Sequence, residues 1–440
     1  MYIQIPDDIS SIMDKIRGAG FTAYLYGEAV RDCILGKTPT EYKIATNARP
    51  NEIKALFTRT IDTSSQSGSI TVIVGKSGYE VITFKKNTQN GIVFSDDPRD
   101  ECLRADFTVN AMLFDRFEGL TDYFGGQRDI QLHLLRCIGH PERRFGEDPI
   151  MMLRAVRLKA TLDFKIDRFT EKIIKKCAVM IKKVNPLLIA DELNKILLSD
   201  NPGCIRDLHR LGLLAHIIPQ LEVCFDQPQK NKYHIYDVGE HIMHTIENTP
   251  NDHTLRWAAL LHDIGKPCCP SKDPNGTIHF YGHHRESRRI AMDILHKFKM
   301  DPQSIHDIAL LVENHDYRVD PNYTSVKRMM SKTGEELFEK LMLLQKADNM
   351  SKNPKHYPEK RSRINSALAL YKEIIATKQP YKISDLAVNS SDLLKLGYRQ
   401  GREISDALKS LLDEVIIKPE LNTRIYLMNR ATEMRKRKRL

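Results

Sequence analysis

The pattern of apolar residues changes once along this chain, near residue 138, and that change limits the folds open to it. Before it, short runs such as FTAYLYG, SITVIVGKSGYEVITF and FTVNAMLFD predict strands and a hairpin, with short helices between them. After it, apolar residues recur at helical spacing, as in MMLRAVRLKATL, and we expect no further strand. The sequence therefore predicts an α+β protein, in which a small mixed-sheet head precedes an all-α neck, body and tail.

The chain has 440 residues, too many for one hydrophobic core, and its length suggests roughly two to four domains. The stretch CFDQPQKNKYHIYD has the polar, turn-rich composition of a linker, and TKQPYKISDLAVNSSDLLKLG opens a last helical module. We expect four segments: a head over 1–137, a neck over 138–225, a histidine-rich domain over 226–370 and a tail over 371–440.

Charge and composition indicate the partners and the compartment. The formal net charge is +10, and the chain ends in MRKRKRL, so we expect a polyanionic partner, nucleic acid first. No apolar run is long enough to span a bilayer, and MYIQIPDDIS lacks the pattern of a signal peptide. The eight cysteines are scattered without a repeated spacing, which favours buried thiols. These features predict a cytoplasmic protein with no membrane partner.

The histidine-rich segment contains HDIGK, in which His262 and Asp263 close an apolar helix. On three other predicted helices, His241, His315 and Asp348 each fall on the apolar stripe. Burying such a group without a partner costs roughly several kcal/mol. One of them alone would be an ordinary core residue, but several from different helices are better explained by a divalent metal. Mixed nitrogen and oxygen ligands suit Mn, Fe, Ni, Co or Zn, and suit Mg less well.

This arrangement resembles the HD phosphohydrolase superfamily, whose metal ligands follow the order His, His-Asp, Asp. The resemblance implies metal ligands at His241, His262, Asp263 and Asp348. It also implies a second metal, or a substrate phosphate, held by His283 or His284 in HFYGHHRES and by His315. We expect catalysis to involve His262, Asp263 and Lys266, with Lys266 neutralising charge on the substrate. A bound metal lowers the pKa of water and polarises a phosphoryl oxygen.

A second resemblance covers nearly the whole chain. GEAVRDCILGKTPTEYKIAT, RADFTVNAML, DYFGGQRDI and EDPIMMLRAVR occur in that order. Together with DELNKILLSDNPGCIRDLHRLGLLAHIIPQL and DLAVNSSDLLKLGYRQGREISDAL, they resemble the class II tRNA nucleotidyltransferase (CCA-adding enzyme) and bacterial poly(A) polymerase family, whose bacterial members can carry an HD insert. The resemblance implies an RNA partner, first the acceptor end of a tRNA, and nucleotides as further ligands.

The nucleotide site implied by that family is altered at four places. The Gly-Gly turn that approaches the triphosphate has become Gly27–Glu28. The metal-binding Asp-x-Asp has become Glu41–Tyr42–Lys43, and a cation at that position costs on the order of several kcal/mol beside a metal. Arg-Arg-Asp has become Arg104–Ala105–Asp106, and Glu-Asp-x-x-Arg now ends in Met151 after Asp148.

Other residues of the family pattern remain, and the chain keeps Arg31, Asp32, Gly36, Phe107, Thr108, Asn110, Gly125, Gly126, Arg154 and Arg157. Glu80, on a predicted strand, is either a leftover third carboxylate or a surface residue. This pattern predicts a retained fold with a lost polymerase site.

Three functions remain open. The first is an RNA-binding protein whose HD domain hydrolyses phosphoesters on RNA 3′ ends or nucleotides with a divalent metal, while its head is inactive. The second is an active CCA-adding tRNA nucleotidyltransferase or poly(A) polymerase. The third is a non-catalytic tRNA-binding protein. We favour the first, because Lys43 opposes the second and the intact set of His and Asp residues opposes the third.

Overall fold

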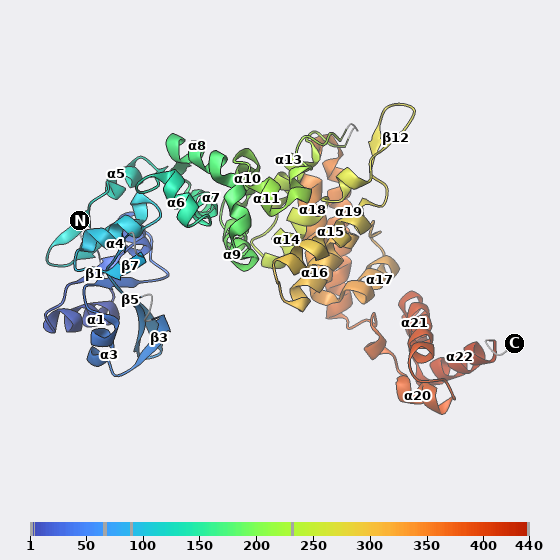
Figure 1. The fold of residues 1–440 in the computed structure, drawn as a ribbon. Helices are drawn as coiled ribbons and strands as arrows, with labels where there is room; N and C mark the ends of the chain where they lie inside the picture. The colour runs from blue at the N-terminus through green and yellow to red at the C-terminus, as the bar shows by residue number, and fades with distance from the viewer. Residues whose placement is uncertain (1–2, 4, 65–67, 89–90, 230–232, 438–440) are drawn as a thin grey trace. The chain divides into compact units, whose positions relative to one another are not determined.

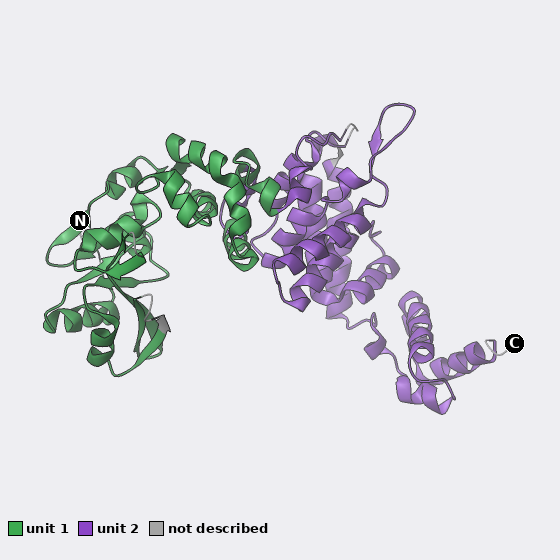
Figure 2. Ribbon diagram, viewed as in Figure 1, with its two compact units in different colours: residues 1–196, 207–217 green, residues 197–206, 218–440 purple. Residues whose placement is uncertain are grey.

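The computed structural model describes residues 3, 5–64, 68–88, 91–229 and 233–437 (Figure 1). The chain forms two compact units (Figure 2). Unit 1 consists of residues 1–196 and 207–217, and unit 2 of residues 197–206 and 218–440. None of the helices in the described ranges combines the length and the apolar character that a membrane crossing requires.

Unit 1 begins with a mixed sheet, which confirms the expected head. Within the described residues seven strands pair in the order β3-β4-β5-β2-β1-β8-β9. Their bounds are β1 (Ala23–Tyr26), β2 (Lys43–Thr46), β3 (Thr60–Ser64), β4 (Ser69–Val74), β5 (Ser77–Thr83), β8 (Met112–Asp115) and β9 (Gly119–Asp122). A separate hairpin is formed by β6 (Lys85–Thr88) and β7 (Gly91–Phe94). Strands β2 and β5 run parallel, which places Lys43 opposite Glu80.

Short helices surround this sheet. They are α1 (Asp7–Gly18), α2 (Glu28–Ile34), α3 (Pro50–Leu56), α4 (Pro98–Arg104) and α5 (Gly126–Gln131). The turn from β1 into α2 passes through Gly27 at φ 77°, a conformation that glycine adopts without a steric penalty. Strand β1 is buried along its whole length, and Tyr24, Ile82 and Leu113 pack together in the core of the head.

One predicted strand is shorter than expected. In FTVNAMLFD, only Met112–Asp115 pairs as a strand, because Thr108–Asn110 forms a 3₁₀ turn first. Asp129 accepts a hydrogen bond from the Thr108 hydroxyl at 2.6 Å. An alternating sequence cannot reveal such a turn, since its side-chain partner lies 21 residues away.

The rest of unit 1 is helical. The elements are α6 (Pro141–Glu147), α7 (Met151–Leu162), α8 (Arg168–Cys177), η3 (Ala178–Lys183), α9 (Pro186–Leu197), α10 (Ile205–Arg210) and α11 (Leu214–Ile217), and the first residues of α10 and the last of α9 belong to unit 2. A two-residue parallel pair, β10 (Leu134–Leu135) with β11 (Lys165–Ile166), also lies here. The expectation that no strand follows residue 138 is therefore wrong in detail, because so short a pairing leaves no apolar pattern.

Unit 2 is built from helices packed around a histidine-rich centre. They are η4 (Pro202–Cys204), α12 (Pro219–Glu222), α13 (Val238–Glu247), α14 (His253–Leu261), η5 (Lys266–Cys268), α15 (His283–Lys297), α16 (Pro302–Asn314), α17 (Tyr323–Thr333), α18 (Glu335–Met350), η6 (Pro354–His356) and α19 (Tyr357–Ala376). A small hairpin, β12 (Ser271–Lys272) with β13 (Ile278–His279), turns at the sequence DPNG. The large buried side chains include Trp257, Phe298 and Phe338.

The last helices form their own hydrophobic cluster. They are η7 (Ile383–Asp385), α20 (Ser390–Lys395), α21 (Arg402–Ile417), η8 (Pro419–Leu421) and α22 (Arg424–Arg437). Leu393, Leu411, Val415 and Leu427 are fully buried between them. The end of the basic C-terminal sequence, 438–440, lies outside the described residues. The division of the chain at 137, 225 and 370 stays a prediction.

Candidate metal centre

Five helices of unit 2, together with the residues that directly follow two of them, contribute six side chains to one buried cluster. His241 lies inside α13, and Asp348 lies in the last turn of α18. His262 and Asp263 directly follow α14, His315 directly follows α16, and His283 opens α15. The Asp237 carboxylate accepts the Glu240 backbone N–H at 2.7 Å and so caps α13 one turn before His241. All six side chains are buried, and for His241, His315 and Asp348 this agrees with the apolar stripes on which they are predicted to lie.

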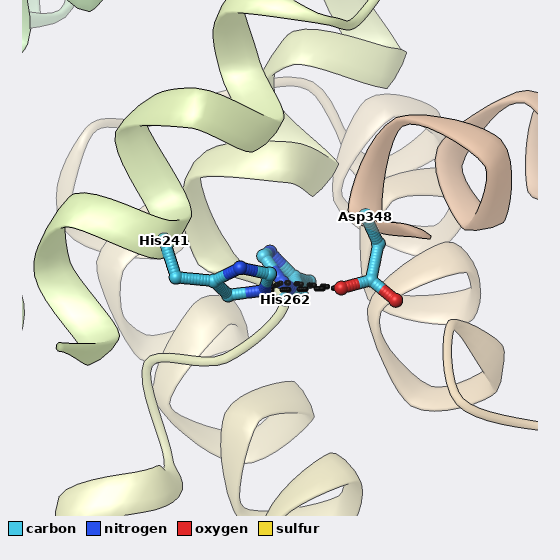
Figure 3. Close-up of side chains that lie close together, drawn as sticks. All are labelled: His241, His262 and Asp348. Carbon is cyan, nitrogen blue, oxygen red and sulfur yellow. Dashed lines mark hydrogen bonds and ion pairs between the residues drawn. The ribbon is translucent and has the colours of Figure 1, made fainter. Parts of the chain in front are cut away.

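One carboxylate oxygen of Asp263 faces the first pair of imidazoles. Asp263 Oδ2 lies 3.3 Å from His241 Nε2 and 3.2 Å from His262 Nε2. The two Nε2 atoms are 3.3 Å apart. Asp348 completes this group from α18, because its Oδ1 lies 3.0 Å from His241 Nε2 and 3.8 Å from His262 Nε2 (Figure 3).

The other oxygen of Asp263 faces a second pair of imidazoles. Asp263 Oδ1 lies 3.3 Å from His283 Nε2 and 3.3 Å from His315 Nε2. These two nitrogens are also 3.3 Å apart. Asp263 therefore lies between two pairs of histidines, with one oxygen directed at each.

The orientation of all four rings is set by backbone carbonyls. The Nδ1 atoms of His262, His283 and His315 lie 2.7 Å from the carbonyl oxygens three residues earlier in the chain. His241 Nδ1 lies 3.2 Å from the Ser351 carbonyl. Since a carbonyl only accepts, each Nδ1 carries the proton, and each Nε2 presents a lone pair to the cluster. Such second contacts are typical of metal-ligating histidines.

The donor atoms of this cluster fit a divalent cation. Oδ1 of Asp263 and Oδ1 of Asp348 are buried without a hydrogen-bond donor among the described residues. Two sets of atoms each lie close enough to hold one ion: His241, His262 and Asp348, and His262, Asp263 and His315. Buried unpaired carboxylate oxygens facing imidazole lone pairs are costly unless a cation lies between them.

Two lysines lie against the carboxylates of the cluster. Lys266 Nζ is 2.6 Å from Asp263 Oδ2 and donates to the Gln229 side-chain oxygen at 2.8 Å. Lys352 Nζ is 2.6 Å from Asp348 Oδ2. Burial would raise the pKa of both aspartates, but electrostatic interactions with neighbouring groups lower it well below the ordinary value: with the His262 ring and Lys266 for Asp263, and with Lys352 for Asp348. Both carboxyls are therefore ionised.

The structure separates the two adjacent histidines at the start of α15. His283 joins the cluster, whereas His284 lines a cavity of about 400 Å³ together with Arg285, Asp316 and Arg318. Burial and the neighbouring His283 lower the pKa of His284, so this imidazole is neutral at neutral pH.

Sequence reasoning did not single out three residues at this centre. Gln229 and His234 lie in the stretch CFDQPQKNKYHIYD, whose polar composition predicts a linker, and Lys352 lies two residues after α18. The His234 ring lies 5.1 Å from that of His241, and its Nδ1 is buried without a partner among the described residues. Burial, with Lys266 and Lys352 nearby, lowers the pKa of His234 to about 2.

In the head, ion pairs occupy the positions of the altered motifs. Lys43 Nζ lies 2.9 Å from Glu80 Oε2, across the β2–β5 pairing. Burial would lower the pKa of Lys43, but its hydrogen bond to Glu80 raises it, so the amine is charged. Both residues line a cavity of about 710 Å³ that also contains Glu41, Tyr42 and Tyr79.

The substituted glutamate of the Gly-Glu turn is likewise paired with cations. Glu28 Oε1 lies 3.3 Å from Arg157 Nη2 and 3.7 Å from Arg31 Nη1. Arg157 Nε lies 2.8 Å from Glu192 Oε2, so it connects α2 of the head to α9. Two arginines that could meet the phosphates of a nucleotide therefore face a carboxylate of the chain itself.

The remaining family positions keep local contacts. Arg31 donates to Asp32 at 2.8 Å and to the Asn110 side-chain oxygen at 2.8 Å. The Asn110 side chain in turn donates to Asp106 at 3.0 Å. Elsewhere, Arg154 lies 3.2 Å from Asp148, and Arg104 donates to Asn87 on the β6–β7 hairpin.

Three family models match successive parts of the chain. The poly A polymerase head domain matches residues 23–136. The probable RNA and SrmB-binding site of polymerase A matches 163–225. The HD domain matches 232–353, the part that contains the histidine cluster.

Curated relatives and solved structures agree with these models. The chain is 38% identical to a CCA-adding enzyme of Limosilactobacillus reuteri over 221 residues, which is 48% of this chain and 54% of the relative. It is 30% identical to one from Leuconostoc mesenteroides over 261 residues, 58% of this chain and 62% of the relative. The chain thus spans about half to three-fifths of the length of these curated relatives.

The fold of the whole chain also has a solved counterpart. A Bacillus stearothermophilus CCA-adding enzyme in complex with CTP has a TM-score of 0.76 at 22% identity, covering 99% of both chains. A Thermotoga maritima CCA-adding enzyme complexed with tRNA has a TM-score of 0.58 at 17% identity, covering 98% of this chain and 96% of that one. At such identities the likeness shows the shared fold.

Proposed function

Because the chain belongs to the family of class II tRNA nucleotidyltransferases and bacterial poly(A) polymerases, with an HD domain, we propose a division of labour between its parts. Head, neck and tail bind RNA, first the acceptor end of a tRNA, and the head no longer adds nucleotides. The HD domain is a divalent-metal-dependent phosphohydrolase acting on RNA 3′ ends or nucleotides.

The observation that carries this proposal is the convergence of four Nε2 atoms on the two oxygens of Asp263. His241, His262 and Asp348 with one oxygen of Asp263, and His283 and His315 with the other, would hold two divalent cations. A bound cation would supply an acidified water and polarise a phosphoryl oxygen.

The chain's own residues have separate tasks beside the cations. Lys266 is buried, and its ammonium lies 2.6 Å from Asp263, where it can bind a phosphate oxygen. Lys352 neutralises the outer oxygen of Asp348 and keeps that carboxylate fixed. The carbonyls of Ala259, Phe280 and Val312 hold the Nδ1 protons, so the imidazoles cannot rotate away.

The proposal for the head rests on electrostatics. The Lys43 ammonium lies where a metal would bind and is already paired with the nearest carboxylate, Glu80. The Glu28 carboxylate is paired with Arg31 and Arg157, and its negative charge there disfavours a bound triphosphate.

The first experiment tests the HD domain. Purified protein is incubated with Mn²⁺ or Ni²⁺, its metal content is measured by elemental analysis, and hydrolysis of nucleoside 2′,3′-cyclic phosphates and terminal phosphates is followed. We expect bound metal and turnover in the native chain, and loss of both in Asp263→Ala. Asp293→Ala, an exposed carboxylate on α15, is the matched control and should change neither. Metal content at background would instead favour a non-catalytic tRNA-binding protein.

The second experiment tests the head. A tRNA lacking its CCA end is incubated with the protein, CTP, ATP and Mg²⁺, and we expect no incorporation. Incorporation that disappears in Glu41→Ala would establish an active nucleotidyltransferase, the function that the curated relatives' names favour.

A further inference from the structure

The short segment between the small hairpin and α15 presents an ordered aromatic pair to solvent. The rings of His279 and Tyr281 stack, with centroids 5.3 Å apart and planes at 10°. Tyr281 is 75% exposed, so the outer face of its ring is open. An exposed tyrosine of this size would ordinarily sample several rotamers, and the stack restricts them.

The inner member of the pair is held by the hairpin. His279 Nε2 lies 3.2 Å from Asp273 Oδ2, and the backbone of His279 pairs with Ser271. The other oxygen of Asp273 accepts the backbone N–H groups of Asn275 and Thr277 at 3.0 and 2.9 Å. The hairpin turn therefore fixes the His279 ring, and the His279 ring in turn orients the Tyr281 ring.

The same segment is tied to the histidine cluster. Phe280, between the two stacked residues, accepts the Nδ1 proton of His283 on its carbonyl at 2.7 Å. The Phe280 ring lies 5.6 Å from Lys266 Nζ, and Lys266 itself contacts Asp263. Tyr281 therefore directly follows Phe280, which contacts both His283, a proposed metal ligand, and Lys266, the proposed phosphate-binding lysine.

Proteins hold nucleobases by stacking them on exposed aromatic rings, an interaction that tolerates any base. We propose that Tyr281, braced on His279, is a platform on which the base of the substrate stacks while its phosphate lies at the Asp263 cluster. This rests on the proposed hydrolase function and narrows it: the preferred substrates carry a nucleobase, as a free nucleotide or as the last residue of an RNA strand.

Binding rather than turnover gives the direct test. Titration calorimetry compares adenosine 5′-monophosphate with ribose 5-phosphate on the Mn²⁺-loaded full chain, since the two differ in the base. We expect the base-bearing ligand to bind about tenfold more tightly. Tyr281→Ala should remove that preference, Tyr281→Phe should keep it, and Tyr323→Ala, an exposed tyrosine on α17, should leave it unchanged.

A second arm separates the two sources of the base. Oligoribonucleotides with a 3′-phosphate end in either adenosine or an abasic residue. If only the oligoribonucleotides show a preference for the base, the platform binds RNA ends. If the mononucleotides show it as well, the platform binds both free nucleotides and RNA ends. If neither arm shows a preference for the base, or if Tyr281→Ala retains it, the platform is disproved, even where hydrolysis is observed. A preference without any hydrolysis would keep the platform and overturn the hydrolase.

Discussion

At the scale of single residues, Lys43 decides how the head is interpreted. The Lys43→Asp substitution adds a third carboxylate to the two, Glu41 and Glu80, that already line the cavity at the edge of β2 and β5. We expect Lys43→Asp to melt at a lower temperature than the native chain without metal and to regain stability with millimolar Mg²⁺, because a cation offsets like-charge repulsion.

The measurement is thermal unfolding with and without Mg²⁺. Lys37→Asp, in the loop before β2, is the control for charge change alone. If Mg²⁺ does not raise the melting temperature of Lys43→Asp, the head lacks the geometry of a metal site as well as its charge.

Arg157 gives a prediction about pH. Burial raises the pKa of Glu192, and Arg157 is the main group that lowers it again. In Arg157→Met the folded-state pKa of Glu192 rises further above its unfolded value, so the variant loses stability as pH rises through that higher pKa. We expect a small deficit in unfolding free energy near pH 4 and about 3 kcal/mol at neutral pH, where the buried carboxylate keeps, among the described residues, only the more distant Arg154, at 3.7 Å.

Urea unfolding of both proteins at pH 4, 5.5 and 7 checks this. A deficit that is the same at every pH would assign the loss to packing of the long side chain rather than to the charge of Glu192.

The residues of the cluster differ in how far sequence could locate them. His241, His315 and Asp348 break an apolar stripe, and that conflict is visible in a helical projection. Which of His283 and His284 faces inward could not be read, because both open a helix and no earlier turn fixes its phase. His234 lies in an irregular segment, where no periodicity exists to make its burial visible.

At the scale of elements, the close approach of the η5 turn to α15 controls the cluster. A Cβ added at Gly265 would lie 2.5 Å from the Ser287 backbone nitrogen and 2.8 Å from the His283 carbonyl oxygen. Backbone atoms cannot move aside as a side chain can, so Gly265→Ala must separate Asp263 from His283.

We expect Gly265→Ala to lose about 1–3 kcal/mol of stability and to bind fewer metal ions per chain. The control is Gly146→Ala in α6, where nothing lies within 4 Å of the added carbon and the helix should gain up to about 1 kcal/mol. Calorimetry measures the stability and elemental analysis the metal content. Unchanged metal content in Gly265→Ala would show that the η5 turn and α15 can move apart without disturbing the cluster.

Elements were predictable where their own sequence specifies them. The β4–β5 hairpin alternates apolar and polar residues around Gly75–Gly78, and its strands pair as that pattern requires. The Thr108–Asn110 turn and the β10–β11 pair depend on partners distant in sequence, so local pattern could not place them.

At the scale of the whole molecule, the two compact units should unfold separately. Arg157, Glu28 and Glu192 all belong to unit 1, whereas Arg256 and its carbonyl partners Leu197, Ser199 and Thr249 belong to unit 2. We expect two calorimetric transitions. Arg157→Met should lower the melting temperature of one transition. Arg256→Met leaves buried carbonyls without their donor and should lower the melting temperature of the other by about 5 °C or more.

Metal supplies the cross-check. Under the proposed function, chelation with EDTA should lower only the transition that Arg256→Met lowers, since ligands stabilise the unit that binds them. One cooperative transition shifted by both substitutions would show that the units fold together.

The carbonyls that hold His262, His283 and His315 lie three residues before each ring in the chain, in the preceding helical turn for His262 and His315 and in the turn that leads into α15 for His283. Each of these segments therefore brings its imidazole already aimed, in the correct tautomer, before any long-range contact forms. The centre then forms when these helix ends, whose imidazoles are already oriented, come into contact. Under the proposed function, a centre made of such parts can persist in a lineage while the site in the head, whose residues depend on one another across a sheet, is lost.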